Sequence, residues 1–230
     1  MKSARFPGLT GNQLKLIALI TMTIDHVGMM LFPKIEILRV IGRIAFPIFA
    51  YMIAEGCQYT RNRKKYLLSM TFLAAVCQVV YFFAMGSLSM SVLVTFSLSI
   101  GLIYLLDQYD PQQRGSQLRF FLGLSGVFFL CYMAHDMLFP KTDFGIEYGL
   151  WGVLLPVFTY WGGKKQKKLQ YFAVGLALLA LTWGGIQLFC LAAIPLLALY
   201  NGQRGKRKMK NLFYIYYPAH LVVIHFLSLL

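Results

Sequence analysis

The sequence predicts an all-α fold, a polytopic transmembrane helical bundle of about nine helices with a cytoplasmic N-terminus. Of its 230 residues, 58% are hydrophobic and only 13% are charged, whereas a soluble domain is about half apolar and a quarter charged. Apolar runs of about 18 residues, long enough to cross roughly 30 Å of hydrocarbon, recur along the whole chain. The connections between them are short, so we expect a single transmembrane domain over residues 1–230.

Nine apolar segments make up the predicted bundle. They cover residues 13–32, 38–57, 66–85, 91–106, 119–139, 147–163, 169–184, 186–200 and 211–230. The first is expected to be a retained helix rather than a signal peptide, because no small-residue cleavage site follows it. The seventh and eighth are nearly continuous across Trp183-Gly184-Gly185, so eight and ten helices are the alternative counts.

The basic residues fall in every second loop. With a cytoplasmic N-terminus, 17 of the 22 basic residues lie on the cytoplasmic side, and the other loops hold Lys34 and Lys141. Basic loops stay on the cytoplasmic side of a membrane, so this alternation predicts nine helices with the C-terminus outside. It also explains the formal net charge of +14 without nucleic acid, because the basic residues form no stripe with interleaved aromatic residues.

The four cysteines stand singly in hydrophobic stretches, without the spacing of a metal site. Neither a disulfide framework nor a bound metal is therefore expected.

Ionisable side chains in the first two segments are the strongest functional signal, because each costs several kcal/mol to place in a membrane. Lys15 and His26 are 11 residues apart, which puts them within about 20° on one helical face and about 16 Å apart along the axis. Arg39 and Arg43 share a face of the second segment. Because only a short loop joins the two segments, they are expected to be antiparallel neighbours, and an Asp25–Arg43 ion pair is geometrically reasonable.

Two further polar positions extend this set. Glu55 lies near the far end of the second segment, where an ion pair with Lys15 is geometrically reasonable. In the last segment Tyr216 and His220 share a face, and Pro218 between them frees backbone carbonyl groups.

Several strings of the sequence together resemble the TraX family, and the resemblance covers nearly the whole chain. They are residues 14–18, 24–26, 38–50, 55–56, 60–66, 148–154, 200–205 and 213–221. The family's namesake acetylates the N-terminus of a conjugative pilin subunit, and the family resembles the wider membrane acyltransferases. Those enzymes carry Arg, ten residues and then His on an early helix. Here the counterpart is Lys15, ten residues and His26, so a lysine replaces the arginine.

The resemblance implies an acyl-CoA-dependent O- or N-acetyltransferase in the bacterial cytoplasmic (inner) membrane. It implies transfer of an acetyl or other acyl group from cytoplasmic acyl-CoA to a hydroxyl or amine reached from the outer side. The acceptor is a glycan, a lipid or a peptide, and direct transfer and an acyl-enzyme route both stay open.

The implied site residues divide into three groups. His26 is the expected general base, with Asp25 beside it and Arg43 stabilising negative charge. The phosphates of acetyl-CoA are expected among the basic residues Lys15, Arg61, Arg63, Lys64 and Lys65. The acceptor side is expected to hold Arg39, Glu55, Tyr216, Tyr217 and His220.

Two other functions compete with the acyltransferase. In a small proton-coupled transporter, Asp25, His26 and Glu55 would relay protons, but the sequence has no inverted repeat of the kind many transporters show. In a non-catalytic membrane assembly factor, the buried polar set would only fix helix packing.

Overall fold

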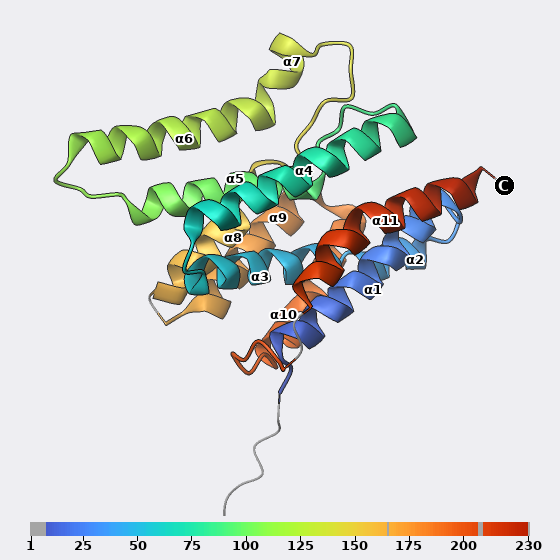
Figure 1. Cartoon of the computed structure of the whole chain (residues 1–230), viewed down its shortest axis with the longest axis horizontal. Helices are drawn as coiled ribbons and strands as arrows, with labels where there is room; N and C mark the ends of the chain where they lie inside the picture. The colour runs from blue at the N-terminus through green and yellow to red at the C-terminus, as the bar shows by residue number, and fades with distance from the viewer. Residues whose placement is uncertain (1–7, 165, 207–208, 230) are drawn as a thin grey trace, which may run out of the picture.

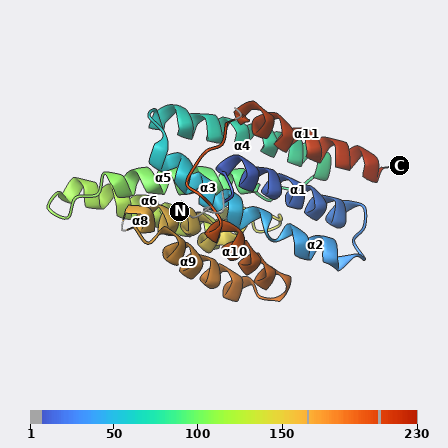
Figure 2. The ribbon, with the colours of Figure 1, turned by 90° about the horizontal axis from the view of Figure 1, so that it is seen from below.

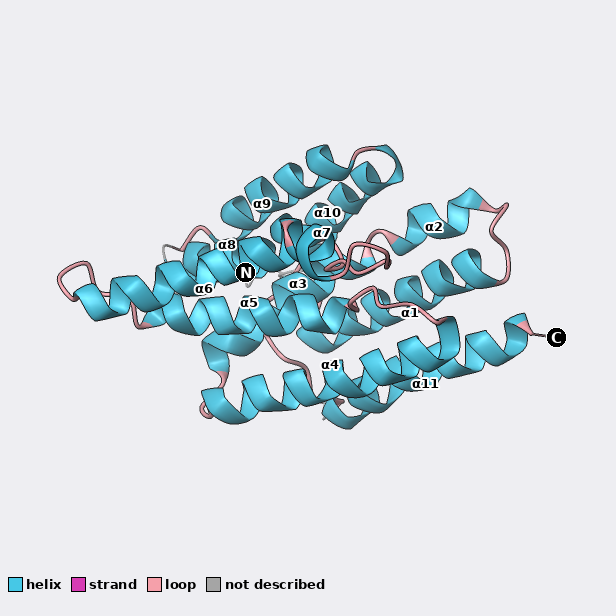
Figure 3. Cartoon of the chain, turned by 90° about the horizontal axis from the view of Figure 1, so that it is seen from above, coloured by secondary structure: helices cyan, strands magenta, loops and turns pink. Residues whose placement is uncertain are grey.

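The computed structural model describes residues 8–164, 166–206 and 209–229, and these residues fold as packed helices (Figure 1). The helices are α1 (Gly11–Met30), α2 (Glu36–Gly42), α3 (Ala45–Tyr59), α4 (Arg63–Met85), α5 (Val92–Asp107), α6 (Arg114–Tyr132), α7 (Ala134–Leu138), α8 (Gly149–Lys164), α9 (Lys168–Trp183), the 3-10 helix η1 (Gly185–Ala192), α10 (Ala193–Ala198) and α11 (Lys210–Ser228). No strand occurs in the described part of the chain (Figure 3). The all-α prediction is confirmed.

All nine predicted segments are helical, but three of them are divided. The expected continuous helix over 38–57 is instead α2 and α3, which meet at Arg43 and Ile44. Pro47 has no N–H to donate to the carbonyl of Arg43 four residues earlier, and its ring crowds that carbonyl. The fifth segment divides into α6 and α7, and the eighth into η1 and α10. Arg43 therefore lies at a helix junction and not within a helix.

The seventh and eighth segments are separate helices. Gly184 and Gly185 between them have φ values of 60° and 51°, in the left-handed region that glycine adopts without strain. The chain reverses there, and η1 packs back against α9 (Figure 2).

The core lies where α3, α5, α8 and α9 meet. Ile48, Ile100, Val153 and Phe172, one from each of these helices, are fully buried. Helix α1 packs on α2, α3 and α11, so the first and last helices lie side by side (Figure 1).

Helix α1 begins at a capping box. The backbone N–H of Gln13 donates to the Thr10 hydroxyl at 3.3 Å, and the backbone N–H of Thr10 donates to the Gln13 side chain at 2.8 Å. Just before the helix, the N–H of Leu9 donates to the carbonyl of Leu199 at 2.7 Å. The start of α1 is therefore fixed to the connection that follows α10.

Asp107 joins three helix ends. It is the last residue of α5, and its side chain is only 6% exposed. Its carboxylate pairs with Arg63 at 2.7 Å, accepts the Tyr160 hydroxyl at 2.6 Å and pairs with Lys164. The start of α4 and the ends of α5 and α8 thus lie together, and we call this the basic end of the bundle.

The loops 86–91 and 139–148 meet at the opposite end. The N–H of Met90 donates to the carbonyl of Gly145 at 2.8 Å, and Asp143 accepts the Ser87 hydroxyl and the Leu88 amide. These two donors hold the pKa of Asp143 below its ordinary value. Successive helix connections therefore gather alternately at the two ends.

Two helical stretches are long and apolar enough to cross a membrane. They are Glu36–Tyr59, which joins α2 and α3, and Arg63–Phe83 in α4. In α4 only 17% of the most apolar window is buried, and Phe72 and Phe83 are 72% and 81% exposed. Such an apolar surface, unlike scattered exposed residues, needs an apolar surrounding or a partner.

Replacing Asp107 by Asn should destabilise the fold by about 1–3 kcal/mol, because Arg63 and Lys164 lose their shared counter-charge. The midpoint of thermal unfolding of the purified protein measures the effect. Asp110→Asn is the matched control, since Asp110 is exposed. An unchanged midpoint for Asp107→Asn would show that the three helix ends are held by other contacts.

Candidate functional site

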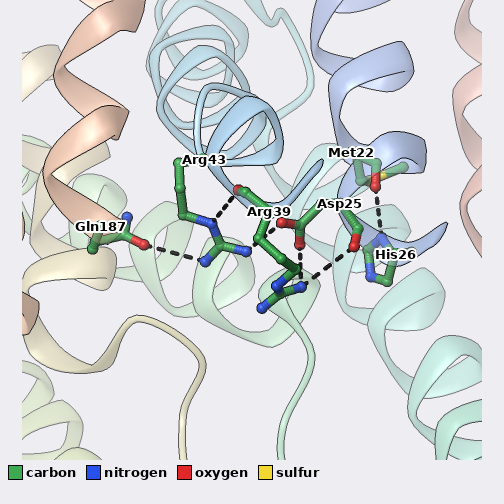
Figure 4. A network of polar contacts seen from close by, with 6 residues as sticks. All are labelled: Met22, Asp25, His26, Arg39, Arg43 and Gln187. Carbon is green, nitrogen blue, oxygen red and sulfur yellow. Dashed lines mark hydrogen bonds and ion pairs between the residues drawn. The ribbon is translucent and has the colours of Figure 1, made fainter. Parts of the chain in front are cut away.

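An ion-pair cluster joins α1 to the junction of α2 and α3 (Figure 4). Arg39 Nη1 donates to Asp25 Oδ2 at 2.9 Å, and Arg43 Nη2 donates to Asp25 Oδ1 at 2.5 Å. The Arg43 Nε also donates to the carbonyl of Arg39 at 3.2 Å. The three side chains are 11–26% exposed, so each carboxylate oxygen has a guanidinium partner in a largely buried place. The Asp25–Arg43 ion pair, which was geometrically reasonable from the sequence, is present.

Two glycines allow the close approach of α1 and α2 that this cluster needs. A Cβ on Gly42 would lie 2.2 Å from the Asp25 side chain, and a Cβ on Gly28 would lie 2.6 Å from the Cβ of Leu38. Any larger residue at either position would push the two helices apart. Gly42 therefore determines that Asp25 can rest against α2.

Gln187, which was not among the site residues expected from the sequence, extends the cluster to η1. Arg43 Nη1 donates to Gln187 Oε1 at 3.2 Å (Figure 4). The Gln187 side-chain nitrogen is buried and has no hydrogen-bond partner among the described residues. The sequence signal that could have identified Gln187 is that it carries the one side-chain amide in the otherwise apolar run 185–192.

Glu147 was also outside the expected site. Its carboxylate interacts electrostatically with Arg43, Asp25 and Arg39 from the loop before α8. That loop is held against α5, because the Thr95 hydroxyl donates to the Glu147 carbonyl at 2.7 Å. Two carboxylates and two guanidinium groups therefore share this region.

Tyr148, the next residue, has a φ of 62°, which is uncommon for a residue with a side chain. Its ring stacks on Phe46 of α3 with 3.8 Å between the centroids. This contact holds the Glu147 loop against α3 just beyond Arg43.

His26 is oriented by a backbone carbonyl and not by Asp25. Its Nδ1 lies 2.8 Å from the carbonyl of Met22 (Figure 4). Because a carbonyl only accepts hydrogen bonds, Nδ1 carries the proton and Nε2 is the basic nitrogen. Asp25, in contrast, directs both carboxylate oxygens to the arginines.

His220 of α11 faces His26. The two ring centroids are 5.0 Å apart, with the planes at 79°. His220 Nδ1 donates to the carbonyl of Tyr216 at 3.0 Å, so its buried Nε2 is also the unprotonated nitrogen, and it has no partner among the described residues. The ring centroids of Tyr216 and Tyr217 lie 5.4 and 5.5 Å from that of His220. Of the expected acceptor-side residues, His220 therefore lies beside the expected base, with Tyr216 and Tyr217 against it.

A hydroxyl pair connects α1 to α11 beside the histidines. The Thr23 hydroxyl donates to the carbonyl of Leu19 at 2.9 Å. Its single proton is therefore used, and the Tyr216 hydroxyl, 2.7 Å away, donates to Thr23. This bond fixes the face of α11 that carries His220.

The other expected residues lie at the basic end. Glu55 pairs with Lys168 and accepts the Tyr200 hydroxyl at 2.9 Å. Lys15 interacts electrostatically with Glu55 and Arg204. Ten residues of α3, or about 15 Å, separate Glu55 from Ala45 next to the arginine junction. The structure therefore does not bring Glu55 to the histidines.

The basic residues 61–65 lie just before α4 and in its first turn, and all four of their Lys and Arg side chains are exposed. Arg63 pairs with Asp107, whereas Arg61, Lys64 and Lys65 form no ion pair in the described part of the chain. Lys64 shares a face of α4 with Thr71, which lines a groove between α4, α5 and α6 to which α1 contributes no residue. Among the described residues no group of three or more His, Cys, Asp or Glu side chains is arranged to hold a metal ion.

Asp25→Asn should lower stability by about 3 kcal/mol, because two largely buried guanidinium groups lose their counter-charge. Thermal unfolding measures this, with the exposed Glu36→Gln on α2 as control. Adding Arg39→Gln and Arg43→Gln to Asp25→Asn should recover part of the loss. If the triple variant is less stable than Asp25→Asn alone, unpaired charge is not the cause.

Comparison with known proteins places the chain in a family. It is 26% identical to a Dichelobacter nodosus protein named "probable fimbrial assembly protein FimC, serogroup H1", over 92% of this chain and 93% of the relative. It is 55% identical over 38 residues, 16% of this chain and 15% of the relative, to an uncharacterized protein of Rickettsia prowazekii. No solved structure matches it. The family model for the TraX protein matches residues 10–228, and the chain therefore belongs to the TraX family.

Proposed function

We propose that this chain is a multi-pass acyltransferase of the bacterial inner membrane, with its N-terminus in the cytoplasm. It moves an acyl group, acetyl in the simplest case, from cytoplasmic acyl-CoA to a hydroxyl or amine reached from the outer side. The observation that carries the proposal is His26, whose Nδ1 is fixed by Met22 while Nε2 is left basic beside His220.

The orientation in the membrane rests on charge. The basic end carries Arg61, Lys64, Lys65 and Arg114 in its loops and first helical turns, and the loops at the opposite end carry Lys34 and Lys141. The side with more Lys and Arg stays cytoplasmic. The exposed apolar surface of α4 supports contact with lipid along the length of the bundle.

The chemistry assigned to His26 is general base catalysis. Nε2 takes the proton from the acceptor, whose oxygen or nitrogen forms a bond to the thioester carbonyl carbon. The carbon–sulfur bond then breaks, and the departing CoA thiolate takes up the proton. His26 lies near the non-basic end of α1, so the acceptor approaches from the outer side.

The arginine cluster would stabilise the negative charge that develops on the carbonyl oxygen. Preorganised donors are effective because they need no rearrangement when charge appears. Asp25 then acts as a positioning residue, since it holds Arg39 and Arg43 and does not touch His26. Gln187 supplies a further polar side chain next to Arg43, and its amide lies beside the thiol of Cys190.

The donor would enter at the basic end. Lys15 and the exposed Arg61 and Lys65 are the phosphate-binding candidates, because Arg63 is engaged by Asp107. The 11 residues from Lys15 to His26 span about 16 Å of α1, the distance that the thioester arm of CoA has to bridge.

A second candidate is a non-catalytic assembly factor, which the name of the Dichelobacter relative favours. In that case the charged cluster serves only to join α1, α2 and η1. An acyltransferase whose acceptor is a component of a surface fibre would also take part in assembly. The two functions are therefore distinguished by whether the protein cleaves acyl-CoA.

Replacing His26 by Ala should lower thiol release from acetyl-CoA by about 10²–10⁴-fold, the usual contribution of a general base. The assay follows free CoA with the purified protein in lipid nanodiscs. His225→Ala is the matched control, because His225 lies on the same helix as His220 and outside the cluster. Folded wild-type protein that neither binds nor cleaves any acyl-CoA would favour the assembly factor.

The membrane orientation has a separate test. In a variant without the four native cysteines, a membrane-impermeant maleimide should label Lys141→Cys in spheroplasts and should label Gln112→Cys only after lysis. Both positions are exposed in the structure, so accessibility differs only through the membrane. The reverse labelling pattern would invert the proposed topology.

A further inference from the structure

A groove of about 540 Å³ opens between α4, α5 and α6, away from the candidate site. Its walls are almost entirely apolar, and its lining includes Leu67 and Leu105 toward the basic end, Gly101 and Gly123 in the walls, and Gln78 and Met90 toward the other end. The amide of Gln78 is already used, since its nitrogen donates to the Ser89 carbonyl at 3.0 Å and its oxygen accepts the Ser91 N–H at 3.1 Å. The groove therefore offers a hydrocarbon surface.

The groove has the length of one bilayer leaflet and is too narrow for a helix, which favours a lipid chain as its occupant. From Leu67 to Gln78 the helix α4 rises about 16 Å, close to half of a hydrocarbon core of roughly 30 Å. A partner helix of three turns, about 10 Å across, would fill roughly 1,200 Å³, more than twice the groove. Inside a bilayer water does not fill such a space, whereas lipid chains do.

The basic end of the groove carries unpaired positive charge. Lys64 precedes Leu67 by one turn of α4, and Arg119 precedes Gly123 by one turn of α6. Both are exposed, and neither forms an ion pair in the part of the chain that the structure describes. Of the nearby acids, Asp107 is neutralised by Arg63 and Lys164, and Asp110 accepts the backbone N–H of Gln112.

We infer that this groove binds an anionic phospholipid of the cytoplasmic leaflet, with one acyl chain between α4, α5 and α6 and its headgroup at Lys64 and Arg119. The inference rests on the membrane orientation of the proposed function and not on its chemistry. Each basic residue at a membrane surface favours an anionic lipid roughly fivefold, so the pair should give a preference of about tenfold or more over a zwitterionic lipid.

Filling the groove with a larger side chain tests whether the acyl chain of the lipid lies there. Gly101 lines the groove, and a Cβ added there meets no atom within 4 Å, so Gly101→Leu places its side chain in the groove. Gly126→Leu is the matched control: its Cβ also meets nothing, and Gly126 does not line the groove. Native mass spectrometry of the full chain in detergent, titrated with phosphatidylglycerol, should show one lipid bound at least tenfold more weakly by Gly101→Leu and with unchanged affinity by Gly126→Leu.

If Gly101→Leu does not fold, Ala75→Leu fills the same space from α4 and should have the same effect. A folded variant of either kind that binds phosphatidylglycerol like the wild type overturns the inference.

Charge removal tests the headgroup. The variant Lys64→Gln with Arg119→Gln should lose the preference for phosphatidylglycerol over phosphatidylcholine of the same chain length. The control variant, Lys34→Gln with Lys141→Gln, removes the same charge from the opposite end and should keep the preference. Equal binding of both lipids by the wild type, or a preference that survives in the Lys64 and Arg119 variant, overturns the assignment of the headgroup.

His26→Ala separates this inference from the proposed enzyme, because it should bind phosphatidylglycerol with wild-type affinity. Lipid binding that depends on the groove, in a protein without activity on acyl-CoA, would reject the enzyme and leave the lipid site standing. Activity on acyl-CoA together with lipid binding that is insensitive to Gly101→Leu would reject the lipid site and leave the enzyme standing.

Discussion

The carboxylate of Asp25 between Arg39 and Arg43 is the interaction on which the arrangement of the site depends. A lone carboxylate in an apolar interior costs so much free energy that its partners have to be present wherever it is buried. The two guanidinium groups can reach it only because Gly42 lets α1 and α2 touch. The same contact places Arg43 at the α2–α3 junction, where Gln187 and Glu147 approach it from later parts of the chain.

The ion-pair cluster and the two histidines differ in how many of their polar atoms have hydrogen-bond partners. Asp25 and Arg43 have hydrogen-bond partners on several of their polar atoms. His26 and His220, in contrast, each hold one ring nitrogen on a backbone carbonyl and leave the other basic. A packing role explains the first group fully. The second group is arranged as a reactive centre is arranged, with fixed rings and free nitrogens, which is why the proposed chemistry is assigned to His26.

Much of this site follows from sequence. Lys15 to His26 and Arg39 to Arg43 are helical spacings, and a short loop makes the first two segments neighbours. The sequence therefore placed Asp25 within possible reach of Arg43, as it did Glu55 and Lys15, without deciding which pair forms. Gln187 and Glu147 were not predictable, because they come from segments more than 100 residues away. Gln187 approaches through the reversal at Gly184 and Gly185, and Glu147 through the contacts of its loop with Thr95 and Phe46. The role of Asp25 could not be decided either, because its position next to His26 in the sequence does not show that the carbonyl of Met22 orients the His26 ring. The partner of Glu55, Lys168, also comes from a distant segment.

The sequence by itself determined the all-helical class, the nine apolar segments and the alternation of charge between loops, because apolar length and loop charge are local properties of the chain. Only the tertiary structure decided how the ionisable groups pair. Asp25 selected the arginines over His26, Asp107 took Arg63 from the expected phosphate-binding set, and Glu55 took Lys168. The physical reason is that an ion pair forms where helices bring charges within a few ångströms, and sequence spacing fixes that distance within a helix but not between helices.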